Sequence, residues 1–391
     1  MSKYQVGHET DSCTCSLLEV DQDALTKILK KGDSFPLLRL TGDLNNLDLE
    51  LVDSAENTPS SYIAISHVWA DGLGNPRDNA LYRCKLLKLR EHVMSVNSVN
   101  PLSTESSGET PLIWLDTLCC PAQDGWGKQN AIEKIRCVYR QAKHVLVLDS
   151  GLMAYKSESQ DVSEKLARIF TSSWMRRLWT LQEGALARSL YFQFADSAVC
   201  LENLGNLILK ERQVSMRHRA VSMDFVNEFL ALASFFGGHS PPTLKVLDDS
   251  LKHRGVSVLT DEPLCIGTLM LLDLAAILAV EPKDRRMQKV WEMLAIKHGG
   301  LPSQIIFFEE PRINEDGWRW APQSLLEMGK GIHDMSSRMV RWFDPKLSPI
   351  TPKGLRVQYR GYKIMKVEDY HDGKPPNPWP GIKRVEETYS E

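Results

Sequence analysis

The chain has 391 residues, 42% of them hydrophobic, and a formal net charge of −3 at pH 7. A chain of this length and apolar content can bury substantial cores, which excludes disorder as its general state and predicts more than one domain. A net charge so close to zero excludes a general electrostatic attraction to nucleic acid or to an anionic membrane surface.

The amino-terminal segment offers three side chains of the kind that bind zinc: His8, Cys13 and Cys15. A structural zinc site needs four ligands, and no fourth is evident nearby. The eight cysteines are irregularly spaced and the first residues contain no basic stretch followed by an apolar one, so we expect reduced thiols in a cytoplasmic protein. We therefore predict no metal site and assign residues 1–60 to an N-terminal extension.

Short apolar segments alternate with helical segments over residues 61–201, which we predict to form one domain. The predicted strands are rich in branched residues and are followed by polar or turn-forming residues: 62–66, 112–116, 144–149 and 190–194. The predicted helices lie between them, at 79–93, at 128–142 and around Trp179. This alternation predicts an α/β fold in which a parallel sheet carries helices on both faces.

A sheet of this kind binds ligands outside the carboxyl ends of its strands. The loop after the first strand places four candidate ligand-binding residues there: His67, Trp69, Asp71 and Gly72. His67 could equally be a hydrogen-bonded structural histidine. Asp116 and Asp149, at the ends of the next two strands, are interpreted as helix caps, since that is the usual role of an aspartate in this position.

The segment 173–183 predicts one helix that carries Trp174, Trp179 and Glu183. Trp179 and Glu183 are four residues apart and share one helical face. Such a pair could hold a flat, positively charged heterocycle against the ring while the acid meets charge that develops on an attached sugar. The alternative is a solvated acid on a helix whose apolar stripe begins at Trp174.

The rest of the chain predicts a helical region over 202–300 and a small β-containing region with a tail over 301–391. The clearest predicted elements are helices at 264–278 and 287–298, strands at 304–308 and 355–364, and a proline-rich linker or tail at 375–380. The apolar run near residue 264 is too short to span a membrane, and the basic stretch at 211–219 is short. We therefore expect neither a membrane nor a nucleic acid as partner.

Several blocks of the sequence, in order, resemble the HET domain of fungal heterokaryon-incompatibility proteins: 62–69, 113–119, 139–149 and 174–183. Two later segments, 254–266 and 318–326, resemble sequences that follow this domain in one large subset of the family. The resemblance implies a role in programmed cell death after non-self recognition. It also implies a fold similar to that of TIR domains, which is a flavodoxin-like parallel sheet.

Many TIR domains hydrolyse NAD with a glutamate in the pattern Trp-Cys-x-x-Glu. Trp179 and Glu183 have the same spacing, with Thr180 in place of the cysteine. The resemblance thus implies a NAD glycohydrolase with Glu183 as the catalytic acid residue and Trp179 as a wall of the pocket. NAD would be the substrate, no cofactor would be needed, and the active form would be a homo-oligomer, with a protein partner in recognition.

Cleavage of the ribosyl bond to nicotinamide passes through an oxocarbenium-like state, which a carboxylate beside the ribose stabilises. We expect His67 and Glu183 to line one cavity for this reaction. Arg254, Asp261 and Glu262 could close over it, although a local ion-pair or capping role is the alternative. The chain has no GxxxxGK[ST], GxGxxG or HExxH motif, which disfavours an ATPase, a dehydrogenase or a zinc protease. The rival function is a death-signalling adaptor that assembles without chemistry.

Overall fold

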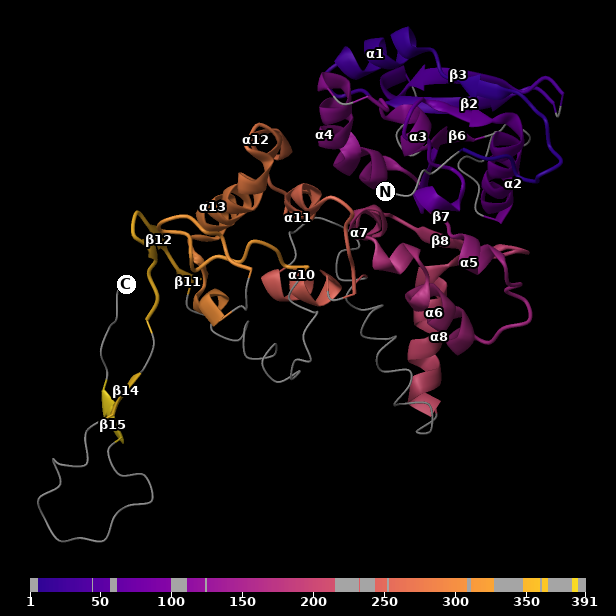
Figure 1. The fold of residues 1–391 in the computed structure, drawn as a ribbon. Coiled ribbons are helices and arrows are strands. Elements are labelled where there is room, and N and C mark those ends of the chain that lie inside the picture. The colour runs from indigo at the N-terminus through magenta and orange to yellow at the C-terminus, as the bar shows by residue number, and fades with distance from the viewer. Residues whose placement is uncertain are drawn as a thin grey trace, which may run out of the picture. The chain divides into compact units, whose positions relative to one another are not determined.

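The computed structural model describes residues 6–43, 45–56, 62–99, 111–123, 125–214, 232, 243–251, 253–307, 311–326, 347–358, 361–364 and 382–385. The chain divides into two compact units, Met1–Ala279 and Val280–Glu391, whose elements are labelled in Figure 1. Over the described residues, none of the helices has the length and apolar character needed to cross a membrane.

A seven-stranded mixed sheet forms the centre of the first unit, in the order β3-β2-β6-β4-β7-β8-β9. Its strands are β2 (Pro36–Thr41), β3 (Asp48–Asp53), β4 (Tyr62–His67), β6 (Leu112–Trp114), β7 (His144–Leu148), β8 (Leu190–Gln193) and β9 (Ala198–Cys200). The four strands β6, β4, β7 and β8 run parallel to one another. These are the four strands predicted from the sequence, so the α/β class and the parallel core are confirmed.

Helices cover both faces of this sheet. All six residues of β4 are buried, as expected for a strand with both faces covered. The Tyr62 hydroxyl donates to the Val138 carbonyl of α4 (Trp126–Gln141) on one face. His67 is five residues further along and so points to the other face, where it lies beside residues of α2 (Arg83–Val99).

Two antiparallel pairings lie outside the sequence prediction. The strands β2 and β3 come from the predicted N-terminal extension yet belong to the main sheet. β1 (Leu17–Glu19) pairs with β5 (Ala80–Tyr82) in a separate two-stranded sheet. The helix predicted over 79–93 therefore starts only at Arg83, because residues 80–82 are held extended by a partner more than sixty residues away.

The segment 173–183 is not one helix, contrary to the prediction. A 3-10 turn η3 (Trp174–Arg176) is followed by α7 (Leu178–Ala185), and Arg177 between them is extended, with φ −94° and ψ 141°. The Gly255 backbone accepts from Leu178 N at 2.8 Å and donates to the Arg176 carbonyl at 2.7 Å. This bridge from a distant residue interrupts the helix, and the Trp179–Glu183 pair remains on α7 alone.

The helix predicted over 264–278 is also two helices. Leu271, between the two, has φ 55°, and the Arg136 guanidinium donates to the carbonyls of Gly267 and Thr268 in the first helix and of Leu272 in the connection. The remaining helices of the first unit are α1 (Gln22–Lys30), α3 (Asp116–Cys119), α5 (Ser150–Met153), α6 (Val162–Thr171), α8 (Leu201–Val214), α10 (Leu244–Leu251), α11 (Glu262–Leu269) and α12 (Leu274–Leu278), with 3-10 turns η1 (Ser54–Glu56), η2 (Trp69–Asp71) and η4 (Leu259–Asp261).

The described residues of the second unit form one long helix and several short strands. Its elements are η5 (Lys283–Arg285), α13 (Arg286–His298), β10 (Leu301–Pro302), η6 (Ser303–Phe307), β11 (Leu347–Ser348), β12 (Ile350–Thr351), β13 (Gly354–Leu355), β14 (Gly361–Ile364) and β15 (Ile382–Val385). The predicted helix 287–298 is confirmed, whereas the strand predicted at 304–308 is a 3-10 turn up to Phe307. The predicted tail at 375–380 lies outside the described residues.

Trp174 and Trp179 have different environments, which generates a stability prediction. Trp174 is fully buried and packs edge-on against Phe192, while Trp179 is half-buried. We expect Trp174→Ala to lower the free energy of unfolding by about 3–5 kcal/mol, the usual result of emptying an aromatic core position. Trp179→Ala, the matched control, should lose clearly less. Urea unfolding of both variants checks this, and equal losses would contradict the distinction.

Candidate functional site

The candidate site lies where the order of the parallel strands reverses. The chain passes from β4 to β6 on one side of β4 and then to β7 on its other side. At such a point the loops leaving the strands diverge, and ligands of α/β proteins bind there. The sheet brings together Ser66 and His67 at the end of β4, Asp116 at the start of α3 and Glu183 on α7.

A partly buried ion pair, with the His67 side chain buried and the Asp116 side chain 29% exposed, joins the end of β4 to the residues that follow β6. His67 Nε2 lies 2.8 Å from Asp116 Oδ1, and Trp69 Nε1 donates to Asp116 Oδ2 at 2.6 Å. Burial opposes a charge on the imidazole, but the nearby Asp116 carboxylate outweighs it and raises the pKa of His67. Burial likewise opposes ionisation of Asp116, but His67 and the Trp69 and Thr117 donors hold its pKa below the ordinary value. Both shifts favour the ionic form of the pair.

Glu183 ends a chain of hydrogen bonds that crosses from the core to the strand end. Trp174 Nε1 donates to Ser66 Oγ at 2.6 Å, and the Ser66 hydroxyl donates to Glu183 Oε2. Burial raises the pKa of Glu183 to about 7, although the Ser66 hydroxyl acts in the opposite direction. A carboxyl group that titrates near neutral pH beside an ion pair is a candidate for function.

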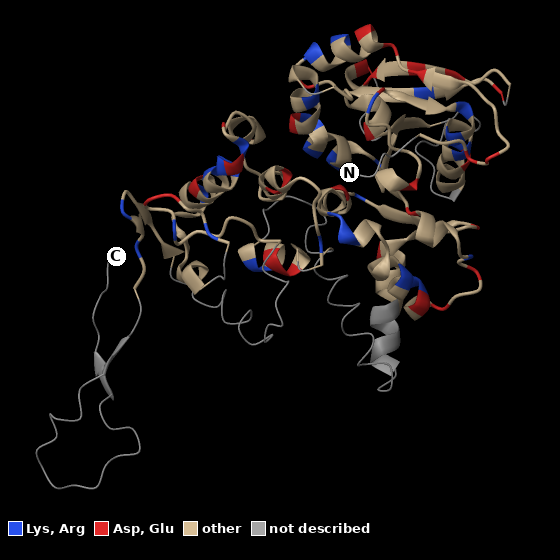
Figure 2. Ribbon diagram, viewed as in Figure 1, with Lys and Arg blue, Asp and Glu red and all other residues tan. Residues whose placement is uncertain are grey.

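A cavity of about 260 Å³ opens beside His67. Among its lining residues are Glu9, His67, Asp71, Lys85, Lys88 and His92. Lys85 and Lys88 belong to α2, whose charged residues are mostly basic (Figure 2). His67 Nδ1 has no hydrogen-bond partner among the described residues, so a protonated ring has an N–H left for an acceptor. The cavity thus offers this N–H and two lysines to a small ligand, while Glu9 and Asp71 also line it and Glu9 pairs with Lys85 at 2.7 Å. Pockets for larger ligands usually exceed about 300 Å³.

Of the four loop residues predicted to bind ligand, two line the cavity and two, Trp69 and Gly72, do not. His67 and Asp71 line the cavity, and Asp71 also accepts from the Ser150 backbone N–H at 2.8 Å. Trp69 is tied to Asp116. Gly72 has φ 106°, and a Cβ there would lie 2.9 Å from Lys85 Nζ. The left-handed backbone favours glycine at position 72, whereas the flexible end of the Lys85 side chain could move away from a Cβ.

His67 and Glu183 do not share the cavity, contrary to the expectation. Glu183 and Trp179 are not among its lining residues. Ser66 and His67 are consecutive strand residues, so their side chains point to opposite faces of the sheet. Glu183 bonds Ser66 on one face, while His67 lines the cavity on the other. This cavity therefore does not bring His67 and Glu183 together in this conformation.

The segment around residues 254–262, which could close over the site or have a local ion-pair or capping role, lies against α7. Arg254 Nη1 donates to the Arg177 carbonyl at 2.8 Å and to Thr180 Oγ1 at 3.1 Å. Trp179 Nε1 donates to Asp261 Oδ2 at 3.2 Å. The indole of Trp179 is thereby engaged by the protein itself, and Glu262 of the same segment is buried.

Some site residues were not identified from the sequence. Ser66 is the hydrogen-bond partner of Glu183, and a polar residue at the end of a run as apolar as residues 62–65 was the available signal. Tyr139 of α4 is buried next to Glu183, and burial and that acid raise its pKa. Lys85 and His92 reach the cavity from a helix whose own pattern carries no sign of a site.

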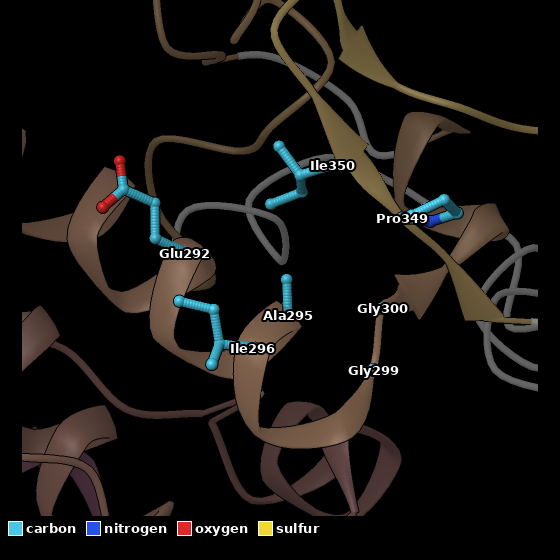
Figure 3. A pocket seen from close by; sticks show the side chains of 7 residues that line it. All are labelled: Glu292, Ala295, Ile296, Gly299, Gly300, Pro349 and Ile350. Atoms are coloured by element: carbon cyan, nitrogen blue, oxygen red, sulfur yellow. The ribbon is translucent and has the colours of Figure 1, made fainter.

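A second cavity, of about 290 Å³, lies within the second unit (Figure 3). It is lined by Glu292, Ala295 and Ile296 of α13, by Gly299 and Gly300, and by Pro349 and Ile350. The lining is mostly apolar and includes none of the predicted site residues. Its one acid, Glu292, bonds to Gln288 and Lys289 on its own helix, so the cavity offers no evident chemistry.

The pKa of Glu183 makes stability depend on pH. The folded chain holds the Glu183 proton more tightly than an unfolded chain, whose carboxyl titrates near 4.5. Tighter binding of this proton stabilises the folded state. This stabilisation is fully present below pH 4.5 and is lost as the pH rises to about 7. Glu183→Gln, a neutral isostere, should therefore be more stable than wild type by about 3 kcal/mol at pH 8 and by little at pH 4.5. Urea unfolding across this range measures the difference, and a pH-independent difference would refute the raised pKa.

The comparisons identify one family for part of the chain. Residues 62–155 match the model of the family described as heterokaryon incompatibility protein (HET). No curated protein and no solved structure matches the chain. The matched segment includes the ion pair of His67 and Asp116 but ends before Glu183. The likeness to the heterokaryon incompatibility family predicted from the sequence blocks is therefore confirmed over residues 62–155.

Proposed function

We propose that this protein is a HET-domain effector that triggers cell death in fungal non-self recognition. The family match over residues 62–155 supports this role. When the four parallel strands are numbered by their order in the chain, they lie side by side in the order 2-1-3-4. Flavodoxin-like sheets have this order, which agrees with a TIR-like core. An active form made of several copies, with a protein partner in recognition, belongs to the same proposal.

We further propose that the chain hydrolyses NAD to nicotinamide and ADP-ribose, with Glu183 as the catalytic residue. The observation that carries this proposal is the Glu183 carboxyl itself: it is held by Ser66, titrates at about 7 and follows Trp179 by one helical turn. A group tuned to neutral pH at the carboxyl ends of parallel strands fits a catalytic role.

In this reaction the bond between the ribose and the nicotinamide nitrogen breaks, and positive charge develops on the ribose. The ionised Glu183 would stabilise that charge and hold a sugar hydroxyl. Nicotinamide leaves as a neutral molecule, so no strong acid is needed. A water molecule then forms a C–O bond to the ribose carbon and releases a proton to solvent. The chain from Trp174 through Ser66 fixes the carboxylate, while Trp179 would flank the base.

The rest of the dinucleotide would use the loop after β4, with His67, Trp69, Asp71 and Gly72. His67 Nδ1 and Lys85 would meet its phosphates in the cavity. Because Glu183 is only 9% exposed and lies off this cavity, substrate binding would require α7 to open. This opening would release Trp179 from Asp261.

A second candidate function is a non-catalytic adaptor that signals through assembly. The observation in its favour is the burial of Glu183 against Ser66, away from the cavity, since a buried, bonded acid can serve packing alone. An adaptor needs the fold but not an ionised Glu183.

NAD turnover distinguishes the two functions. Purified protein should release nicotinamide, and Glu183→Gln should lower turnover by about 100-fold or more while remaining folded, as when an electrostatic stabiliser is removed. Glu164→Gln, at an exposed acid of α6, is the matched control and should keep wild-type activity. A folded Glu183→Gln with unchanged NAD loss would remove Glu183 from the mechanism. Because activity can depend on assembly, wild type is assayed over a wide concentration range, and no turnover at any concentration would favour the adaptor.

The Ser66 hydroxyl should set the pH dependence of this activity. Turnover should rise with pH through about 7 as Glu183 ionises. Ser66→Ala removes a hydrogen bond that lowers the Glu183 pKa, so the midpoint of kcat/KM against pH should move upward by about one pH unit. Ser66→Thr keeps a hydroxyl and should stay near wild type. An unchanged midpoint in Ser66→Ala would show that another group controls the profile.

A further inference from the structure

We propose that His8, Cys13, Cys15 and Cys84 bind one Zn²⁺ ion. Their ligand atoms all lie within 4.8 Å of one another, although Cys84 is 69 residues beyond Cys15. The three cysteines have free thiols. The prediction of no metal rested on a missing fourth ligand, and the fold supplies it.

The spacing of these atoms fits a tetrahedral zinc site. With Zn–S bonds of about 2.3 Å and Zn–N bonds of about 2.0–2.1 Å, a tetrahedral Cys₃His site has S···N edges of about 3.6 Å. His8 Nδ1 lies 3.5 Å from Cys15 Sγ and 3.8 Å from Cys84 Sγ. These two S···N separations therefore match those that a bound ion imposes, and the other ligand atoms lie within 4.8 Å of one another.

The pairing of β1 with β5 explains why Cys15 meets Cys84. Leu17 is opposite Tyr82, and Arg83 N donates to the Ser16 carbonyl at 3.0 Å. One further step in this antiparallel register places Cys15 opposite Cys84. Cys84 N accordingly donates to Cys15 Sγ at 3.3 Å.

Neighbouring groups orient the ligands. The His8 ring stacks on Tyr82, with centroids 3.7 Å apart and an angle of 27°. Glu9 N donates to Cys84 Sγ at 3.2 Å, a contact that stabilises a thiolate. Outer contacts of this kind are usual around metal ligands, because they fix ligand geometry.

The donor set selects the metal. Three thiolates and one imidazole form a common structural zinc site, closed to substrate, and soft thiolates disfavour Mg²⁺ or Ca²⁺. The consequence is local: the ion would anchor the segment before β1 to the start of α2. That segment carries Glu9, which lines the His67 cavity and pairs with Lys85 at 2.7 Å. Zinc would thus fix one wall of the cavity.

The test uses the full chain purified under reducing conditions. Elemental analysis should find about one zinc ion per chain in wild type and in Cys137→Ser, whose exposed thiol makes it the matched control. Cys13→Ser and Cys84→Ser should lose the metal. A chelator should lower the Tm of wild type and Cys137→Ser by about 5 °C or more, and should leave the cysteine-to-serine ligand variants unchanged.

Cobalt keeps the proposal testable if a variant fails to fold. Adding Co²⁺ to chelator-treated wild type should produce the absorption of a tetrahedral thiolate site, and added Zn²⁺ should abolish it. Zinc-free wild type that gains no stability from added Zn²⁺ and gives no cobalt absorption would overturn the proposal. Equal zinc content in wild type and folded Cys84→Ser would also overturn it. A disulfide among the three cysteines in protein purified under reducing conditions would do the same.

Discussion

A buried carboxyl group needs a hydrogen-bond donor, and this constraint organises the candidate site. Glu183 meets it through Ser66, which is itself fixed by Trp174. Three elements are tied together by two hydrogen bonds, because the residues belong to α7, β4 and η3. Ser66 cannot be moved independently, since it is part of the central strand of the sheet. The position of Glu183 therefore follows from the packing of the core.

The same strand end separates two kinds of chemistry. Ser66 points to one face of the sheet, where it bonds Glu183, whose pKa is about 7. His67 points to the opposite face, where it pairs with Asp116. One carboxyl has a raised pKa and the other a lowered one. Environments that push two acids apart in this way are typical of functional sites. In the present conformation Glu183 does not line the cavity beside His67, so a reaction that used both residues would require movement of α7 or of the loop after β4.

The parts of the fold predicted correctly are those with local signals. β4, β7 and α4 followed from apolar runs and helical spacing. The errors arose where a distant partner decides the structure: Gly255 interrupts the helix before Leu178, and β1 extends residues 80–82. The site shows the same division. The Trp179–Glu183 pair is a local pattern, whereas Ser66 as a partner of Glu183 and Cys84 as a fourth zinc ligand depend on long-range pairing that spacing does not encode.

The central claim is that burial, partly offset by the hydrogen bond from Ser66, raises the pKa of Glu183 to about 7. Infrared spectroscopy of the protonated carboxyl band, recorded between pH 4 and 9, tests it most directly. The Glu183→Gln variant identifies the band that belongs to Glu183. The account predicts a band that is absent from the variant and disappears in wild type with a midpoint of about 7. A band lost near pH 4.5, the ordinary value for glutamate, would contradict the account.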